Sequence, residues 1–211
     1  VEVKETNRGP RILVSRTHPD LVKRLFEKEV AEIQDGTVEI KNIVREAGSR
    51  TKMAVWSNDK NVDPVGACVG LNGARVNAIV NDLKGEKIDI INWNEDPCVF
   101  IENALSPSNV ISVEVDEEEK SARVVVPDYQ LSLAIGKEGQ NARLAARLTG
   151  YKIDIKNETQ AIESGELPAD YMNMAENYED DYQEEEYSDE EYSADEESEE
   201  EVADDLDLYE E

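Results

Sequence analysis

Two short glycine motifs carry the chemistry that this sequence suggests. Gly136-Lys137-Glu138-Gly139 lies between two segments with apolar residues at helical spacing, and Gly70-Leu71-Asn72-Gly73 lies upstream in the same setting. Glycine has no Cβ, so a sugar–phosphate chain can approach such a loop closely. The helix that follows presents N–H groups that lack an intrahelical partner and carry a partial positive charge. Each motif is therefore expected to bind an anion such as a nucleic-acid backbone.

The two motifs belong to an internal repeat. The loops are 66 residues apart, and each is followed by the tetrapeptide KIDI, at residues 87–90 and 152–155, with a spacing of 65 residues. One isolated GxxG arises easily by chance and usually marks a tight turn between helices. Two copies with matching flanks predict two related modules instead.

The second copy carries more positive charge than the first. Residues 69–90 contain three basic and three acidic side chains, whereas residues 135–156 contain five basic and two acidic ones, a balance of +3. Arg143 and Arg147 share one helical face, and Ile135 is expected to line a groove for bases beside the loop. Because phosphate neutralisation dominates affinity, the second copy is predicted to bind more strongly. The alternative interpretation is that these arginines only solvate an exposed helix face.

The hydrophobic pattern predicts an α+β fold with the same order of elements in each copy: helix, strand, strand, helix, GxxG, helix, strand. In the first copy these elements are expected at residues 19–30, 37–45, 50–57, 64–69, 74–85 and 88–90. In the second they are expected at residues 97–105, 111–115 and 122–126, then as helices on both sides of the loop and a strand around 153–155. Val38, Ile40 and Val44 alternate on one side of their strand. Helix caps are expected at Asp63, Asp96 and Asp128.

The net charge of -28 comes mostly from the C-terminal segment. Residues 158–211 hold 25 of the 50 acidic residues and no Lys or Arg, so residues 1–157 carry 25 acidic and 22 basic side chains, a difference of -3. A segment of Glu, Asp, Ser, Tyr and Asn without apolar periodicity cannot bury enough surface to offset its ordering entropy. Residues 158–211 are therefore predicted to be a disordered acidic tail.

No residue cluster in the sequence predicts catalysis, a metal site or a cofactor. Cys68 and Cys98 lie in apolar runs without metal-ligand spacing, so they are interpreted as buried hydrophobes in a reducing cytosol. The single histidine, His18, has no nucleophile motif beside it. No apolar run approaches the ~20 residues needed to cross a bilayer, and no signal-peptide pattern is seen. We expect a cytoplasmic protein that is not an enzyme and, because the chain starts at Val1 rather than Met, a fragment of a longer one.

These motifs resemble the paired KH modules of the bacterial transcription factor NusA family. The resemblance rests on DPVGACVG followed by GARV at residues 63–76, on AIGKEGQNARLAARLTG at residues 134–150, and on residues 11–30. It implies two tandem type II KH domains, at residues 18–94 and 95–157, after the end of a truncated OB-type RNA-binding barrel and linker at residues 1–17. It also implies a monomeric elongation factor that binds single-stranded nascent RNA, sits on RNA polymerase, and modulates pausing, termination and antitermination.

The resemblance further implies which residues contact RNA. In the first loop these positions are Gly70, Leu71, Asn72, Gly73 and Arg75. In the second loop they are Gly136, Lys137, Glu138, Gly139, Gln140, Asn141 and Arg143. Relatives often have a basic residue inside the first loop, where this chain has Leu71-Asn72, and a strong phosphate contact is therefore less expected there.

A second function class stays open, in which the KH folds serve as a scaffold for protein–protein interaction. The acidic tail would then be a docking segment, with a short apolar motif formed by Val202, Leu206, Leu208 and Tyr209. A further hypothesis is that the tail competes with RNA for the basic face around Arg143 and Arg147, because tethering gives its carboxylates a high effective concentration. Salt-dependent binding of single-stranded RNA would separate RNA binding from the scaffold interpretation.

Overall fold

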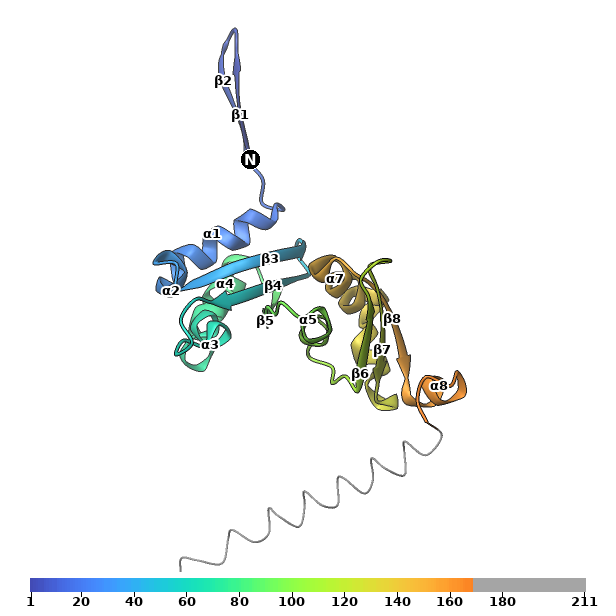
Figure 1. Cartoon of the computed structure of the whole chain (residues 1–211). Helices are drawn as coiled ribbons and strands as arrows, with labels where there is room; N and C mark the ends of the chain where they lie inside the picture. Colours follow the sequence, from blue (N-terminus) through green and yellow to red (C-terminus); the bar gives the residue numbers. More distant parts are fainter. Residues whose placement is uncertain (169–211) are drawn as a thin grey trace, which may run out of the picture. The chain divides into compact units, whose positions relative to one another are not determined.

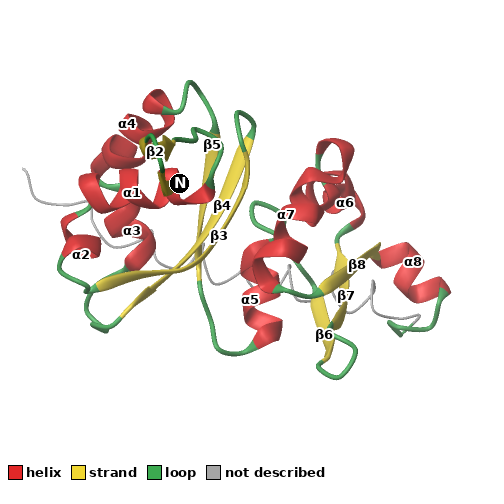
Figure 2. Ribbon diagram, turned by 90° about the horizontal axis from the view of Figure 1, so that it is seen from above, coloured by secondary structure: helices red, strands yellow, loops and turns green. Residues whose placement is uncertain are grey.

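Each glycine motif lies in a module built from a three-stranded sheet and helices (Figures 1 and 2). The computed structural model describes residues 1–168. The sheets have the orders β3-β4-β5 and β6-β7-β8, and in each sheet the first two strands are antiparallel and the last two parallel. The predicted α+β fold, with the same order of elements in both copies, is confirmed.

Each module is formed by one continuous stretch of the chain. A hairpin of β1 (Glu2–Thr6) and β2 (Gly9–Leu13) precedes the first module. The first module contains α1 (Pro19–Glu29), α2 (Ala31–Gln34), β3 (Val38–Glu46), β4 (Arg50–Ser57), α3 (Pro64–Val69), α4 (Ala74–Asp82) and β5 (Lys87–Asn92). The second contains α5 (Pro97–Ala104), β6 (Ser112–Asp116), β7 (Ser121–Val126), α6 (Leu131–Ile135), α7 (Gln140–Thr149), β8 (Lys152–Asn157) and α8 (Glu158–Glu163).

The core of the first module lies between its sheet and its helices. Val22 and Phe26 on α1 are fully buried, as their spacing predicts, and they pack in one cluster with Met53 and Val55 on β4. The Asp63 carboxylate caps α3 by accepting hydrogen bonds from the N–H groups of Val65 and Gly66. The predicted start of this helix is therefore confirmed.

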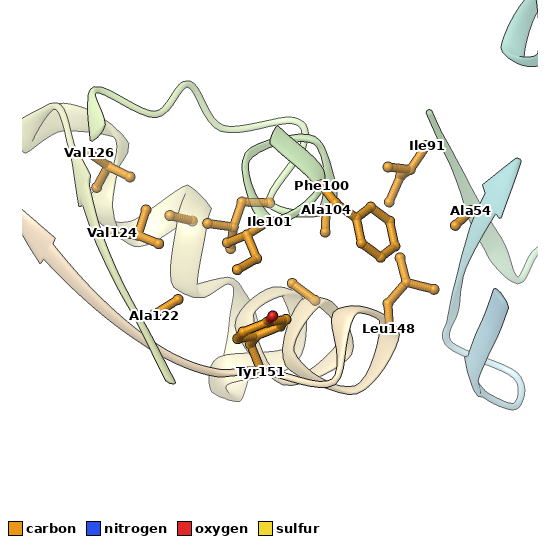
Figure 3. Close-up of a cluster of buried hydrophobic side chains, with 13 residues drawn as sticks. Ala54, Ile91, Phe100, Ile101, Ala104, Ala122, Val124, Val126, Leu148 and Tyr151 are labelled. Carbon is orange, nitrogen blue, oxygen red and sulfur yellow. The ribbon is translucent and has the colours of Figure 1, made fainter. Parts of the chain in front are cut away.

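The core of the second module extends onto the other face of the first sheet. Ala54 on β4 and Ile91 on β5 lie beside Phe100 and Leu148 (Figure 3), and all four belong to the cluster that fills the second module. Strand β4 is consequently buried from both sides. Because the two modules share this cluster, residues 1–167 form one compact unit.

A β-bulge changes which side chains of β3 face the first core. The register of β3 against β4 shifts between Ile40 and Asn42, which reverses the alternation beyond that point. Ile43 packs against the first core, and Val44 packs against the cluster of the second module. The prediction that Val44 shares a face with Val38 and Ile40 is therefore wrong.

The end of the second module differs from the sequence prediction. Residues 158–163 form α8, which begins with a capping box at Asn157 and buries Ala161 completely. Thr159 Oγ1 donates a hydrogen bond to Asp128 Oδ2 at 2.6 Å, so Asp128 holds α8 and does not cap α6, whose N-cap is Gln130. The predictions of disorder from residue 158 and of an Asp128 cap are both wrong. The rest of the predicted disordered tail, with the apolar motif at 202–209, lies outside the described residues.

The N-terminal hairpin, the two cysteines and the possible membrane or metal sites complete the description of residues 1–168. The β1–β2 hairpin is exposed along its whole length, and its assignment to a truncated barrel stays a prediction. Cys68 is fully buried, as predicted, but Cys98 is only partly buried. Among the described residues, no helix has the length and hydrophobicity to span a membrane, and no group of three or more His, Cys, Asp or Glu side chains could hold a metal ion.

Candidate nucleic-acid interface

The two GxxG loops have the same backbone conformation. The first glycines, Gly70 and Gly136, have φ/ψ of 72°/172° and 75°/172°, and the second glycines have 74°/15° and 73°/18°. Asn72 and Glu138, between the glycines, are left-handed with φ of 52° and 53°. In both loops the second glycine N–H donates to the carbonyl of the first, at 3.0 and 3.1 Å. The repeated sequence therefore gives a repeated loop geometry.

The first glycine of each loop is required by close packing as well as by its positive φ. A Cβ on Gly136 would lie 2.9 Å from the backbone nitrogen of Asn141, and one on Gly70 would lie 2.7 Å from Arg75 Cγ. A Cβ on Gly139 would meet no atom within 4 Å. The residue five positions after each first glycine thus packs against it, so Asn141 and Arg75 help to shape the loops.

In the first loop two of the predicted residues are exposed, and a third forms hydrogen bonds within the module. Leu71 is 85 % exposed, and Asn72 is also exposed. Arg75 Nη1 instead donates to Glu32 Oε2 at 2.9 Å and to the carbonyl of Ala67 at 2.6 Å. Arg75 therefore connects α4 to α2 and α3, and its guanidinium is already engaged within the first module.

In the second loop Lys137 and Glu138 are exposed, and Ile135 beside them is 37 % exposed. Asn141 is only 4 % exposed, and its Nδ2 donates to the carbonyls of Leu105 and Ala134, both at 3.0 Å. These two bonds fix α7 to α5 and α6. The Asn141 side chain consequently contributes to the position of the loop and does not face solvent.

Two further predicted residues of the second copy bind the first module. Arg143 Nε donates to Glu46 Oε1 at 2.7 Å, and Gln140 Nε2 donates to Glu46 Oε2 at 2.8 Å. The hydrogen bonds from Arg143 and Gln140 lower the pKa of the Glu46 carboxyl to about 2. Arg147 is exposed on the same helix, and its positive charge also lowers the Glu46 pKa. Sequence reasoning missed Glu46 because 97 residues separate it from Arg143.

Comparison with known proteins agrees with this duplicated architecture. A NusA-like first KH domain matches residues 16–93, and a NusA-like second KH domain matches residues 97–163. The chain belongs to the NusA family. The expected family and its two tandem KH domains are thereby confirmed.

Relatives from several bacteria are named transcription termination/antitermination protein NusA. The protein from Bacillus subtilis is 66% identical over 167 residues, which are 79% of this chain and 45% of the relative. Those from Halalkalibacterium halodurans and Thermus thermophilus are 64% and 54% identical, over 79% and 72% of this chain and 44% and 39% of the relatives. The chain thus spans less than half the length of these NusA proteins. Their name describes a transcription protein and not an enzyme.

The ion pairs change the charge comparison between the two NusA-type modules. Arg143 pairs with Glu46, and Lys156 pairs with Glu166. Both carboxylates lie outside residues 135–156, so the net charge of that segment falls from +3 to +1 when these pairs are counted. In residues 69–90, Arg75, Glu86 and Asp89 pair with residues outside the segment. The net charge of this segment therefore rises from 0 to +1. Net charge no longer separates the copies. What still distinguishes them is Lys137, the one cation within either GxxG.

A groove lies between the two modules, next to the end of β5. It has a volume of about 470 Å³ and is lined by Val65 from α3 and by Ile90 and Asn92 from β5. Asn103 and Asn109 of the second module line the same groove. The lining combines apolar side chains with three asparagines, two serines and Glu102, so it offers bases both a surface to stack on and hydrogen-bonding groups for their edges.

Proposed function

We propose that this chain binds single-stranded RNA through both KH modules, as part of a transcription elongation factor that acts on RNA polymerase pausing, termination and antitermination. The observation that carries the RNA-binding proposal is the shared backbone geometry of the two GxxG loops, each preceded by a short helix and followed by a longer one. The transcription role draws on the name of the NusA relatives.

The loops supply the contacts to the RNA backbone. At Gly70, Gly73, Gly136 and Gly139 a phosphate meets backbone without a Cβ, next to a helix start that has no side-chain cap. Lys137 adds a full positive charge at the second loop. A KH module holds about four nucleotides in this way, so both modules together would hold roughly eight.

The candidate residues divide into two roles under this proposal. The exposed members, Leu71, Asn72, Ile135, Lys137, Glu138 and Arg147, lie where RNA can reach them. Asn141 and Arg75 act indirectly, since Asn141 Nδ2 and Arg75 Nη1 donate to carbonyls within their own modules and both side chains pack against the first glycine. Gln140 and Arg143 connect the second loop to Glu46 and so fix the position of one loop relative to the other module.

The remaining parts of the proposal concern the setting of this RNA binding. RNA polymerase is the proposed protein partner, contacted mainly through parts of the longer protein that this chain lacks. The chain would act as a monomer in the cytoplasm, on nascent RNA that has not yet formed a duplex.

The proposal is tested by measuring fluorescence anisotropy of a labelled single-stranded RNA of about 12 nucleotides, long enough for two modules. A hairpin that contains the same nucleotides in a duplex serves as the matched control. We expect tighter binding of the single strand and a linear fall of log K with log salt concentration. Absent binding, or binding that salt does not weaken, would instead favour the protein-interaction scaffold.

A further inference from the structure

A second cleft lies where the first module meets the second GxxG loop. Its volume is about 530 Å³, within the ~300–1,000 Å³ typical of small-ligand sites. The first module contributes Ser49, Arg50 and Lys87. The second contributes Gly136, Lys137 and Gln140. The cleft is therefore composite, and neither module alone contains it.

The lining of this junction cleft is positively charged. It contains three cations and no carboxylate. Arg50 pairs with Asp89 at 2.7 Å, but Asp89 also pairs with Lys52 at 3.0 Å, so this group of three keeps one positive charge. Lys87 and Lys137 are exposed and form no ion pair among the described residues. An anion in the cleft would meet two available ammonium groups from different modules.

The walls of the cleft are held in place by bonds between the modules. Gln140 Nε2 donates to Ser49 Oγ at 2.7 Å and to Glu46 Oε2 at 2.8 Å. The Lys87 backbone N–H donates to the Ser49 carbonyl at 3.1 Å. Lys87 and Lys137 are thus attached to segments that are already fixed relative to each other. A site that is formed before binding loses less free energy in ordering its groups.

We propose that the junction cleft binds one phosphodiester group of the RNA, between the nucleotides held by the two modules, with Lys87 and Lys137 as its cationic contacts. The inference rests on the proposed RNA binding and adds a subsite to it. Lys87 lies at the start of β5, 14 residues after Gly73, and is not part of a GxxG loop. Its role follows from its place in the cleft, not from its position in the repeat.

The test compares Lys87→Gln, Lys137→Gln and the double variant in the full chain. Each single variant is expected to weaken RNA binding roughly fivefold or more, and to reduce the slope of log K against log salt by about 0.7. If both lysines contact one phosphate, the fold loss of RNA affinity in the double variant is smaller than the product of the fold losses in the two single variants. Lys23→Gln, which removes the same charge from an exposed position on α1, is the matched control and should change neither affinity nor slope.

A chemical change in the RNA tests the same contact from the other side. A single neutral methylphosphonate is moved along the strand, and each RNA is measured with wild type and with Lys87→Gln. At one linkage the wild type should lose more affinity than Lys87→Gln does, because the variant already lacks one of the two cationic contacts to that phosphate. If Lys87→Gln binds the RNA as tightly as Lys23→Gln does, or if every linkage weakens wild type and Lys87→Gln equally, the subsite is refuted. The RNA-binding proposal itself would fail if the wild type did not bind the RNA, or bound it without a dependence on salt.

Discussion

Glu46, the last residue of β3, forms an ion pair with Arg143 on α7, with 2.7 Å between Oε1 and Nε. The same carboxylate accepts a hydrogen bond from Gln140, the first residue after the second GxxG loop. A side chain of the first module therefore fixes the start of the helix that follows the loop of the second. This contact makes the relative position of the two loops depend on one carboxylate.

The Glu46 contact should make stability depend on pH. The folded-state pKa of about 2 lies below the ordinary value of 4.5, so the stabilisation is fully present above pH 4.5 and is lost as pH falls toward 2. Glu46→Gln should lower the free energy of unfolding at pH 7, and its difference from wild type should shrink between pH 4.5 and 2. Urea unfolding at several pH values measures this. Glu118→Gln, in an exposed turn, is the control, and an equal pH profile for both variants would contradict the expectation.

The first glycine of the second loop should be less replaceable than the second one. Gly139→Ala places a Cβ in open space, so it should cost about 1–2 kcal/mol for the left-handed conformation alone. Gly136→Ala adds a clash with the backbone of Asn141, and Gly136 lies at φ 75°, ψ 172°, a conformation essentially restricted to glycine, so this variant should cost about 1–3 kcal/mol more. Urea unfolding of both variants measures the difference. Equal losses would show that the packing between Gly136 and Asn141 is not tight in solution.

The buried ion pair between Arg45 and Glu86 should matter far more than an exposed one. The two side chains are 3% and 1% exposed, and Glu86 also accepts hydrogen bonds from Thr51 Oγ1 and the Gly48 N–H. Glu86→Ala should cost about 3–5 kcal/mol, because it leaves the arginine buried and unpaired. Glu114→Ala breaks the exposed pair with Arg123 and should cost less than about 1 kcal/mol. A small loss for Glu86→Ala in thermal unfolding would contradict this ranking.

Removal of the acidic C-terminal segment should tighten RNA binding at low salt. Residues 169–211 contain 22 Asp and Glu residues and no Lys or Arg, and they are tethered to the second module. Truncation after Pro168 removes a competitor for cationic sites, and the gain should disappear at high salt because the competition is electrostatic. A cut after Asn157 is unsuitable since it would also remove α8 and the buried Ala161. Unchanged low-salt affinity of the Pro168 truncation would exclude competition by this segment.

Local patterns in the sequence predicted the parts of the fold that depend on near neighbours. Helical spacing identified Val22 and Phe26 as core residues, and the Asp63-Pro64 pair predicted the start of α3. The bulge after Ile40 could not be predicted in this way, because it depends on the pairing with β4. A bulge reverses every later side chain on a strand.

The candidate site was predictable as a pair of loops but not as a set of side-chain partners. The repeat revealed the GxxG motifs, whereas Arg143 received its partner Glu46 from a strand 97 residues away. Lys52, on β4, is fully buried and donates to the carbonyl of Ser106 across the modules. Charge counts over short segments failed for the same reason, since the neutralising groups lie elsewhere in the chain.

The central claim is that both GxxG loops hold the RNA backbone and that the second holds it more firmly. Leu71→Asp with Asn72→Asp, and Lys137→Asp with Glu138→Asp, each change the net charge by -2 and keep both glycines, so the two double variants are matched. Aspartate also tolerates the left-handed conformation required at the second position.

The decisive measurement is the affinity of these two variants for the same single-stranded RNA at one salt concentration, with unfolding curves to confirm that both remain folded. Both variants should bind more weakly than wild type. The second-loop variant should bind about tenfold or more weaker than wild type, and the first-loop variant should lose less affinity than that. Wild-type affinity in both folded variants would contradict the account.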